Sequence, residues 1–123
     1  MPFKKKEDPA VIAAALLVPQ EDVERVWDAW VAEHGNFGKG RQHKLTEGKN
    51  QDIRVGIVKY GIDDCLLAIS GILYSPWHMG DNPAGKMYNS PEIIFREGWR
   101  VKKFKKLFLD NKQLTVAEVM EDE

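Results

Sequence analysis

The sequence contains one cysteine and no long apolar run. Cys65 alone cannot form an internal disulfide, which fits a reducing cytoplasm, and its apolar surroundings predict a small core residue rather than a nucleophile. No stretch approaches the ~20 apolar residues that a membrane span needs. The basic start MPFKKKEDPA is not followed by an apolar segment with a small-residue cleavage site. We therefore expect a cytoplasmic chain without a membrane segment.

Patterns typical of catalytic or metal centres are also lacking. No Ser/His/Asp or Cys/His arrangement is suggested by spacing, and Glu92 has no evident carboxylate partner for acid–base work. His78, Asp81 and Asn82 raise a metal hypothesis, but a metal needs three or four ligands in a close cluster. The favoured alternative is that these three side chains hydrogen-bond the backbone of their own loop. We expect no enzymatic activity, no catalytic residue, no cofactor and no metal.

What the chain does contain is helical periodicity. With 123 residues it is long enough for one domain with a hydrophobic core. Apolar spacing and capping residues predict helices at about 9–17, 21–34, 46–60, 63–74, 91–97 and 99–109, with Asp8, Thr46, Asp63 and Ser90 as caps. We predict an all-α fold, a compact single domain of five to six short helices with one long ordered loop. Its expected core is Val26, Trp27, Trp30, Ile57, Leu66, Ile69, Leu73 and Phe104.

The domain is expected to occupy residues 9–110. Residues 1–8 form a flexible basic arm, and 111–123 form a short helix or an acidic tail that could fold back over the basic helix before it. The glycine-bearing basic loop at 36–44 lacks the spacing of a phosphate-cradling loop, which argues against nucleotide binding there.

The segment at 75–96, SPWHMGDNPAGKMYNSPEIIFR, contains the long loop. Loops of more than roughly a dozen residues are usually functional or tightly packed on themselves. Trp77 and Tyr88 are expected to pin this loop onto the core helix at 63–74, because each ring offers a large apolar area. If the Trp77 ring is in the core, its replacement by alanine should cost roughly 3–5 kcal/mol.

Charge is nearly balanced overall, at −1, but it is unevenly distributed. Five basic residues fall within the seven positions from Arg100 to Lys106. On a helix, positions 99, 102, 103 and 106 share one side while Val101 and Phe104 point inward. The candidate binding residues for a nucleic acid or a protein partner are Arg96, Trp99, Arg100, Lys102, Lys103 and Lys106. The alternative interpretation is an ordinary solvated helix face.

Residues from about 23 to 108 resemble a small helical domain of phage replication proteins. The matching pieces are the VWDAW helix, the YGIDD start of the apolar helix, and above all the run from SPWHMGDN through Tyr88 to Arg96. More distantly, the pattern is similar to the DnaD-like domain of replication-restart proteins. That domain ends in a motif of Tyr, Ile and Trp at four-residue steps, whereas the same steps from Tyr88 reach Glu92 and Arg96 here.

The resemblance implies a phage-encoded replication accessory module in the host bacterial cytoplasm, which binds single-stranded DNA or a replication protein. The alternative is a protein-interaction factor that engages or inhibits a host protein without binding DNA.

Overall fold

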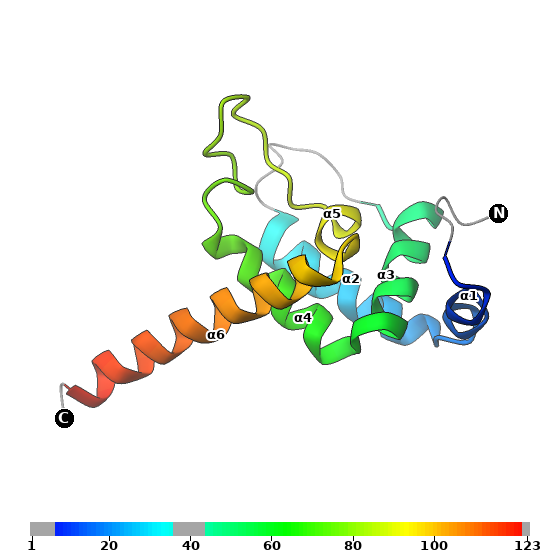
Figure 1. The fold of residues 1–123 in the computed structure, drawn as a ribbon, viewed down its shortest axis with the longest axis horizontal. Coiled ribbons are helices and arrows are strands. Elements are labelled where there is room, and N and C mark those ends of the chain that lie inside the picture. Colours follow the sequence, from blue (N-terminus) through cyan, green and yellow to red (C-terminus); the bar gives the residue numbers. More distant parts are fainter. Residues whose placement is uncertain (1–6, 36–43, 122–123) are drawn as a thin grey trace.

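The computed structural model describes residues 7–35 and 44–121, with the stretch from 113 described by its backbone alone. The predicted all-α fold is confirmed, and the described residues form helices joined into one domain (Figure 1). In chain order the elements are α1 (Pro9–Leu16), α2 (Gln20–His34), α3 (Glu47–Tyr60), α4 (Ile62–Gly71), the 3-10 helix η2 (Ile72–Tyr74), α5 (Pro91–Phe95) and α6 (Gly98–Glu121). None of the described helices is both long and apolar enough to cross a membrane.

Side-chain caps fix the starts of α1, α3 and α5. The Asp8 carboxylate accepts a hydrogen bond from the Ala10 amide at 2.8 Å, and Thr46 and Ser90 cap α3 and α5 in the same way. The predicted cap at Asp63 is wrong, because α4 begins one residue earlier, at Ile62. Gly61 precedes it with a φ of 84°, a conformation that glycine adopts without strain and that turns the chain sharply from α3 into α4.

The centre of the molecule is the crossing of α4 over α6. Gly71 lies so close to α6 that a Cβ atom on it would come within 1.7 Å of the Phe104 carbonyl oxygen. Phe104 itself is fully buried. The absence of a side chain at Gly71 therefore lets the two backbones meet, and the surrounding apolar side chains close around that contact.

The predicted core is confirmed in its centre and corrected at its edge. Val26, Trp27, Trp30, Ile69 and Phe104 are buried, whereas Ile57 and Leu66 pack against the core from its rim and Leu73 is half-buried. Cys65 is a core residue, as predicted. The core also takes in Ile53, Ile72, Ile94, Phe95 and Val101, which were not among the eight residues of the expected core.

The last helix is longer than expected. α6 was predicted to end near residue 109, but it continues as one helix to Glu121. Figure 1 shows its C-terminal half leaving the helical body in a straight line. Residues 111–121 therefore point away from the basic part of α6, and the expected folding back of an acidic tail does not occur over these residues. The predicted basic arm falls largely on residues 1–6, which are outside the described part.

Candidate nucleic-acid interface

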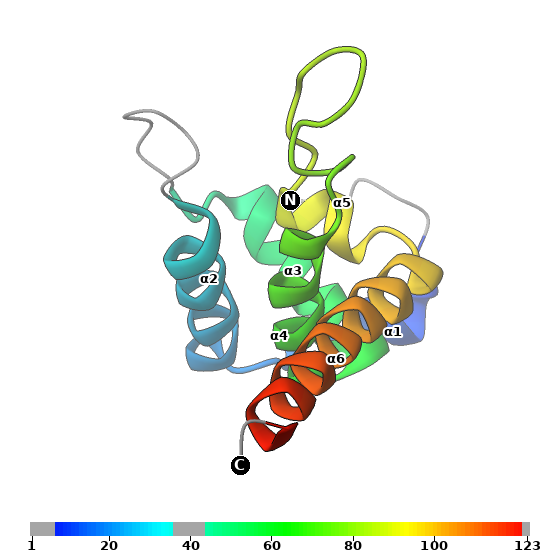
Figure 2. The ribbon, with the colours of Figure 1, turned by 90° about the vertical axis from the view of Figure 1, so that its left-hand side faces the viewer.

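The loop between η2 and α5 stands out from the helical body in two perpendicular views (Figures 1 and 2). Its inside is organised by the Asn82 side chain. The Asn82 amide donates to the carbonyl oxygens of Trp77 and Lys86, both at 2.7 Å, and its oxygen accepts from the Lys86 amide at 3.2 Å. A single antiparallel bridge joins Met79 to Met87. The loop is thus ordered by local hydrogen bonds, as predicted for Asn82.

The predicted packing of Trp77 on the core helix is wrong. Its side chain is 51% exposed. The Trp77 ring stacks instead on Tyr88, with centroids 5.1 Å apart and an angle of 17° between the ring planes. The Lys86 ammonium group lies 5.7 Å from the centre of the Tyr88 ring. Trp77 and Tyr88 therefore hold the two limbs of the loop to each other and present an aromatic surface to solvent.

His78, the next residue, makes the contact with the core that was expected of Trp77. Its ring meets Phe104 edge-on at 5.0 Å and meets Trp77 at 5.2 Å. The His78 Nδ1 atom hydrogen-bonds the Ser75 hydroxyl at 2.7 Å rather than the loop backbone, so that part of the prediction is wrong. Asp81 is exposed and makes no side-chain hydrogen bond within the described residues.

Burial lowers the pKa of His78, and the positive charges of Lys103 and Arg100 lower it further. Those two charges belong to α6, so the base of the loop lies beside the basic helix. The lowered pKa keeps the His78 imidazole neutral at physiological pH. His78 therefore contacts Trp77 of the aromatic stack and lies near two cations of α6.

The other end of the loop is tied to α2 by partly buried hydrogen bonds, and a buried hydrogen bond joins α2 to α4. The Trp30 indole donates to the Asn89 carbonyl oxygen at 2.7 Å, and the Asn89 amide lies 2.9 Å from His34 Nδ1. His34 Nε2 lies 2.9 Å from the Ile69 carbonyl oxygen, which can only accept a hydrogen bond. The Nε2 atom therefore carries the proton, and Nδ1 accepts from Asn89.

Neither His34 nor Asn89 was singled out from the sequence. The pattern did contain a signal for His34, because it follows Val23, Val26, Trp27 and Trp30 on the same inner stripe of α2. His34 is almost completely buried, and its ring stacks on Trp30. Burial lowers the pKa of His34, a shift that the hydrogen bond to Ile69 and the charge of Glu33 partly offset.

The exposed lysines of α6 form the charged part of the surface. Lys102, Lys103 and Lys106 are exposed and make no ion pair within the described residues. Val101 and Phe104 are buried on the opposite side of the helix, as predicted. We call Lys102, Lys103 and Lys106 the lysine strip. Trp99, which is 59% exposed, begins the same side of the helix one turn earlier.

The two predicted arginines are held in place by the protein itself. Arg96 pairs with Glu92 at 3.0 Å one turn back. Arg100 donates to the Ile93 carbonyl oxygen at 3.3 Å, and its guanidinium lies 5.3 Å from the centre of the Trp99 ring. The Nε atom of Arg100 is buried without a hydrogen-bond partner in the described part of the chain. Arg100 thus orients Trp99, and Arg96 has its charge partly neutralised.

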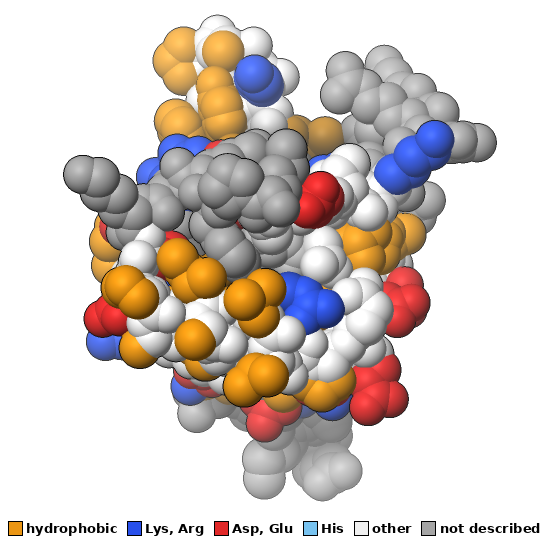
Figure 3. All heavy atoms as spheres, turned by 90° about the vertical axis from the view of Figure 1, so that its right-hand side faces the viewer, with side chains coloured by type: hydrophobic (Ala, Val, Ile, Leu, Met, Phe, Trp, Pro, Cys, Tyr) orange, Lys and Arg blue, Asp and Glu red, His pale blue; other side chains and the backbone are white. Residues whose placement is uncertain are grey.

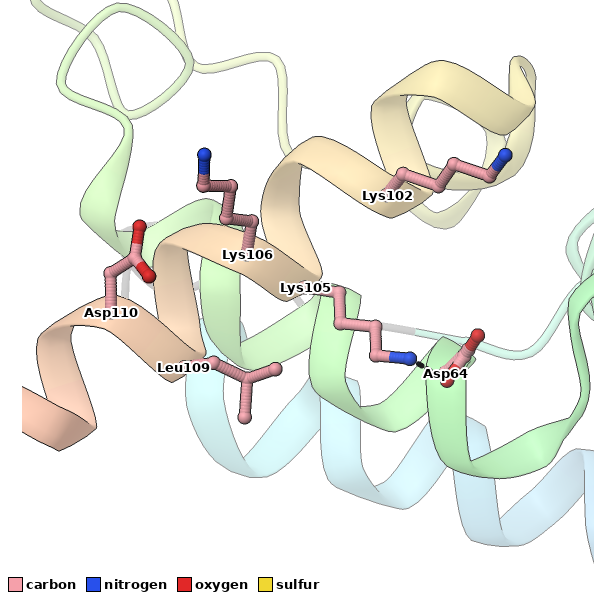
Figure 4. Close-up of a pocket in the computed structure, with 6 residues that line it drawn as sticks. All are labelled: Asp64, Lys102, Lys105, Lys106, Leu109 and Asp110. Atoms are coloured by element: carbon pink, nitrogen blue, oxygen red, sulfur yellow. Dashed lines mark ion pairs between the residues drawn. The ribbon is translucent and has the colours of Figure 1, made fainter.

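On its α4 side, the lysine strip borders an open groove of about 470 Å³. The groove is lined by Asp64, Lys102, Lys105, Lys106, Leu109 and Asp110 (Figure 4). Lys105 bends across to Asp64 and pairs with it at 3.0 Å, whereas Lys102 and Lys106 extend away from that pair. This side of α6 therefore presents both signs of charge, whereas Lys103 and Arg100 lie near His78 at the base of the loop.

Among the residues that the structure describes, no group of three or more His, Cys, Asp or Glu side chains is placed to hold a metal ion. Comparisons with known proteins give no match to this chain, whether with family models, with curated proteins or with solved structures. The candidate interface therefore rests on the geometry of this chain alone.

Proposed function

We propose that this chain binds single-stranded nucleic acid, and single-stranded DNA in particular, as an accessory module in phage replication. The observation that supports the binding is the position of the Trp77–Tyr88 stack. The Trp77 ring is half-exposed and contacts His78, which lies near Lys103 of the lysine strip. The replication setting is supported by the resemblance of residues 75–96 to the helical domain of phage replication proteins.

The chemistry of a single strand matches both parts of this surface. An unpaired base has an exposed π face that stacks on an aromatic side chain, whatever the base, while the phosphates beside it attract lysine. In a duplex the bases are stacked on each other and do not reach such a platform. The Trp77–Tyr88 stack and Trp99 serve as base platforms in this proposal. The lysine strip contacts the phosphates of the strand.

The experiment is a titration of fluorescently labelled oligothymidine with the full chain, followed by anisotropy at a low and a moderate salt concentration. We expect binding that weakens steeply with salt, with a slope that reports the number of phosphates contacted. The double variant Lys103→Glu/Lys106→Glu should abolish binding at moderate salt. The matched control is Arg25→Glu/Lys44→Glu, which changes net charge equally at exposed positions on α2 and ahead of α3.

Loss of binding in the first variant with retention in the control supports the proposal. Equal loss in both variants would show that net charge alone governs binding and would contradict a defined site. No affinity for single-stranded or duplex DNA at low salt would also contradict the proposal.

A second candidate is a protein partner, and the mixed charges of the groove favour it. Asp64 and Asp110 line the groove together with Lys102 and Lys106, with Leu109 between them. A partner segment with both acidic and basic side chains fits such a lining better than a uniformly charged phosphate backbone does. In this alternative the chain engages or inhibits a host protein without binding DNA. The Lys102→Glu variant would then weaken binding to that protein.

A further inference from the structure

A continuous apolar segment covers the opposite end of the molecule. Residues 9–19, from Pro9 to Pro19, carry no polar side chain. They form α1 and the turn after it, and only Ala15 among them is fully buried. Leu16 and Leu17 are 67% and 82% exposed, more than any other large hydrophobic residue described. Figure 3, which views this side, shows apolar side chains gathered over the face.

This helix is firmly built in spite of its exposure. Asp8 caps its N-terminus. At its C-terminus the Arg54 guanidinium donates to the carbonyl oxygens of Ala15 and Val18 and to the Gln20 side chain. Arg54 belongs to α3, so it fixes α1 to the body of the protein. An isolated helix of this length is unstable in water. The Asp8 cap and the Arg54 hydrogen bonds therefore hold α1 in place while it leaves an apolar face in solvent. Apolar patches of this kind usually mark an interaction surface.

We propose that α1 is a pairing surface for a second copy of this chain, with the two α1 helices packed antiparallel about a two-fold axis at Ala13. In a two-fold interface the same patch must be complementary to itself. The exposed face of α1 meets this condition through the sizes of its side chains. They are small in its first half, at Pro9, Ala10 and Ala13, and large at its end, at Leu16 and Leu17.

The antiparallel arrangement places each large side chain against a small one. With Ala13 facing its own counterpart, Ala10 of each copy faces Leu16 of the other, and Pro9 faces Leu17. Because the face carries no charge, pairing brings no like charges together, and antiparallel helix dipoles attract each other. A charged or polar partner would find no complementary group on this face. The lack of charge argues against a charged partner, and the matching of side-chain sizes favours a second copy as the occupant.

The pairing leaves the candidate nucleic-acid interface uncovered. Figure 1 shows α1 at one end of the molecule, with the projecting loop and the C-terminal half of α6 away from it. One short helix contributes less than the ~800 Å² per partner of a standard stable interface, so we expect a weak dimer that forms as concentration rises. The dimer is thus independent of the proposed nucleic-acid binding, and the two can fail separately.

The first experiment is sedimentation equilibrium of the full chain over a hundredfold range of concentration, up to about 1 mM, where weak interfaces of this size associate. We expect a reversible monomer–dimer equilibrium. Leu16→Glu should remove it, because each copy would bury a charge against Ala10 of the other. The double variant Ala10→Lys/Leu16→Glu should restore it, because each Lys then faces a Glu across the axis. The control Ala32→Glu, at an exposed position on α2, should dimerise like the parent.

The second experiment is oxidation of the Ala13→Cys variant. Facing Cα atoms at a close antiparallel crossing come within the ~4–7 Å that a disulfide spans. The native thiol does not interfere, because burial raises the pKa of Cys65 to about 12. A covalent dimer should form with Ala13→Cys and not with Ala32→Cys. The proposal is overturned if the parent is monomeric throughout, if Leu16→Glu dimerises like the parent, or if both cysteine variants cross-link equally.

Discussion

The α4–α6 crossing and the 75–89 loop meet at His78, whose ring contacts Phe104 on one side and Trp77 on the other. Phe104 is fully buried and Trp77 is half-exposed, although the two aromatic residues are separated by one imidazole ring. At the crossing, order comes from close packing, which brings the Gly71 backbone against the Phe104 carbonyl group. In the loop, order comes from hydrogen bonds centred on Asn82.

The difference separates the source of stability from the source of the proposed binding. Buried apolar area contributes most of the free energy of folding, so the crossing holds the protein together. The loop buries little, yet it is ordered, and its aromatic rings remain available to a ligand. A substitution of the same kind in the two regions should therefore have very different effects.

The largest expected effect is that of Phe104→Ala. Removal of a fully buried ring leaves a cavity between α4 and α6, and such substitutions cost about 3–5 kcal/mol. Urea denaturation should show this loss in the free energy of unfolding. Phe108→Ala, one turn later on the same helix at a half-buried position, is the matched control and should cost less. Equal losses for both would contradict the central place of the crossing.

The next effect is that of Gly71→Ala, which adds a single methyl group. The new Cβ would overlap the Phe104 carbonyl oxygen, so α4 and α6 must separate, and overpacking of this kind costs about 1–3 kcal/mol or more. Gly98→Ala is the control, because a Cβ there would lie at 3.5 Å from Tyr60, an ordinary contact. Thermal unfolding should show a lower midpoint for the first variant and not for the second.

A smaller loss of folding stability is expected on acidification. Burial lowers the pKa of His34 from its ordinary value of 6.5, so the unfolded chain takes up a proton at a higher pH than the folded one. Stability is then fully present above pH 6.5 and is lost as the pH falls below it. Protonation of Nδ1 would also break the hydrogen bond from Asn89, which anchors the loop.

The measurement is urea denaturation at a series of pH values for the parent and for His34→Gln. The parent should lose more stability than the variant on acidification from neutral pH. His78, whose pKa is also lowered, contributes in the same direction in both proteins, so the difference between them reports His34. Identical pH dependence in the two proteins would show that His34 is not linked to folding.

Most of the helical framework could be predicted from the sequence, because its signals are local. The apolar stripe of α2 and the caps at Asp8, Thr46 and Ser90 depend on residues a few positions apart. The end of α6 could not be placed in this way. No glycine or proline follows Leu109 to stop the helix, so no local signal marks its end.

The candidate site was harder to predict, because it depends on contacts between distant segments. The sequence indicated a basic face on α6 and an aromatic loop, and both exist. It assigned the core contact to Trp77 because of ring size, whereas the structure gives it to His78. Which of two adjacent side chains faces the core depends on the direction in which the chain leaves η2 at Ser75. Similarly, the Asn89–His34 hydrogen bond joins residues too far apart for any local pattern to indicate.

The smallest expected change in stability is that of Trp77→Ala, and this variant tests the contrast between the two regions most directly. The side chain is half-exposed, and its main partner is the Tyr88 ring, so the loss should be about 1 kcal/mol or less instead of the 3–5 kcal/mol that a core tryptophan would give. Chemical denaturation of parent and variant measures this directly. A loss as large as that of Phe104→Ala would show that the ring is part of the core in solution.

The same variant should have a much larger effect on nucleic-acid binding. Removal of an aromatic platform costs about 1–3 kcal/mol per stacked base, which lowers the affinity for oligothymidine by roughly fivefold to 150-fold. Trp77→Phe keeps a ring that can stack on Tyr88 and should retain most of the affinity, which makes it the matched control. Because phosphate contacts are unchanged, the salt dependence of binding should stay that of the parent, whereas Lys103→Glu/Lys106→Glu should reduce it. If Trp77→Ala changed the salt dependence of binding without lowering the affinity, Trp77 would lie outside the base-binding surface. The lysine strip would then be the part that contacts the ligand.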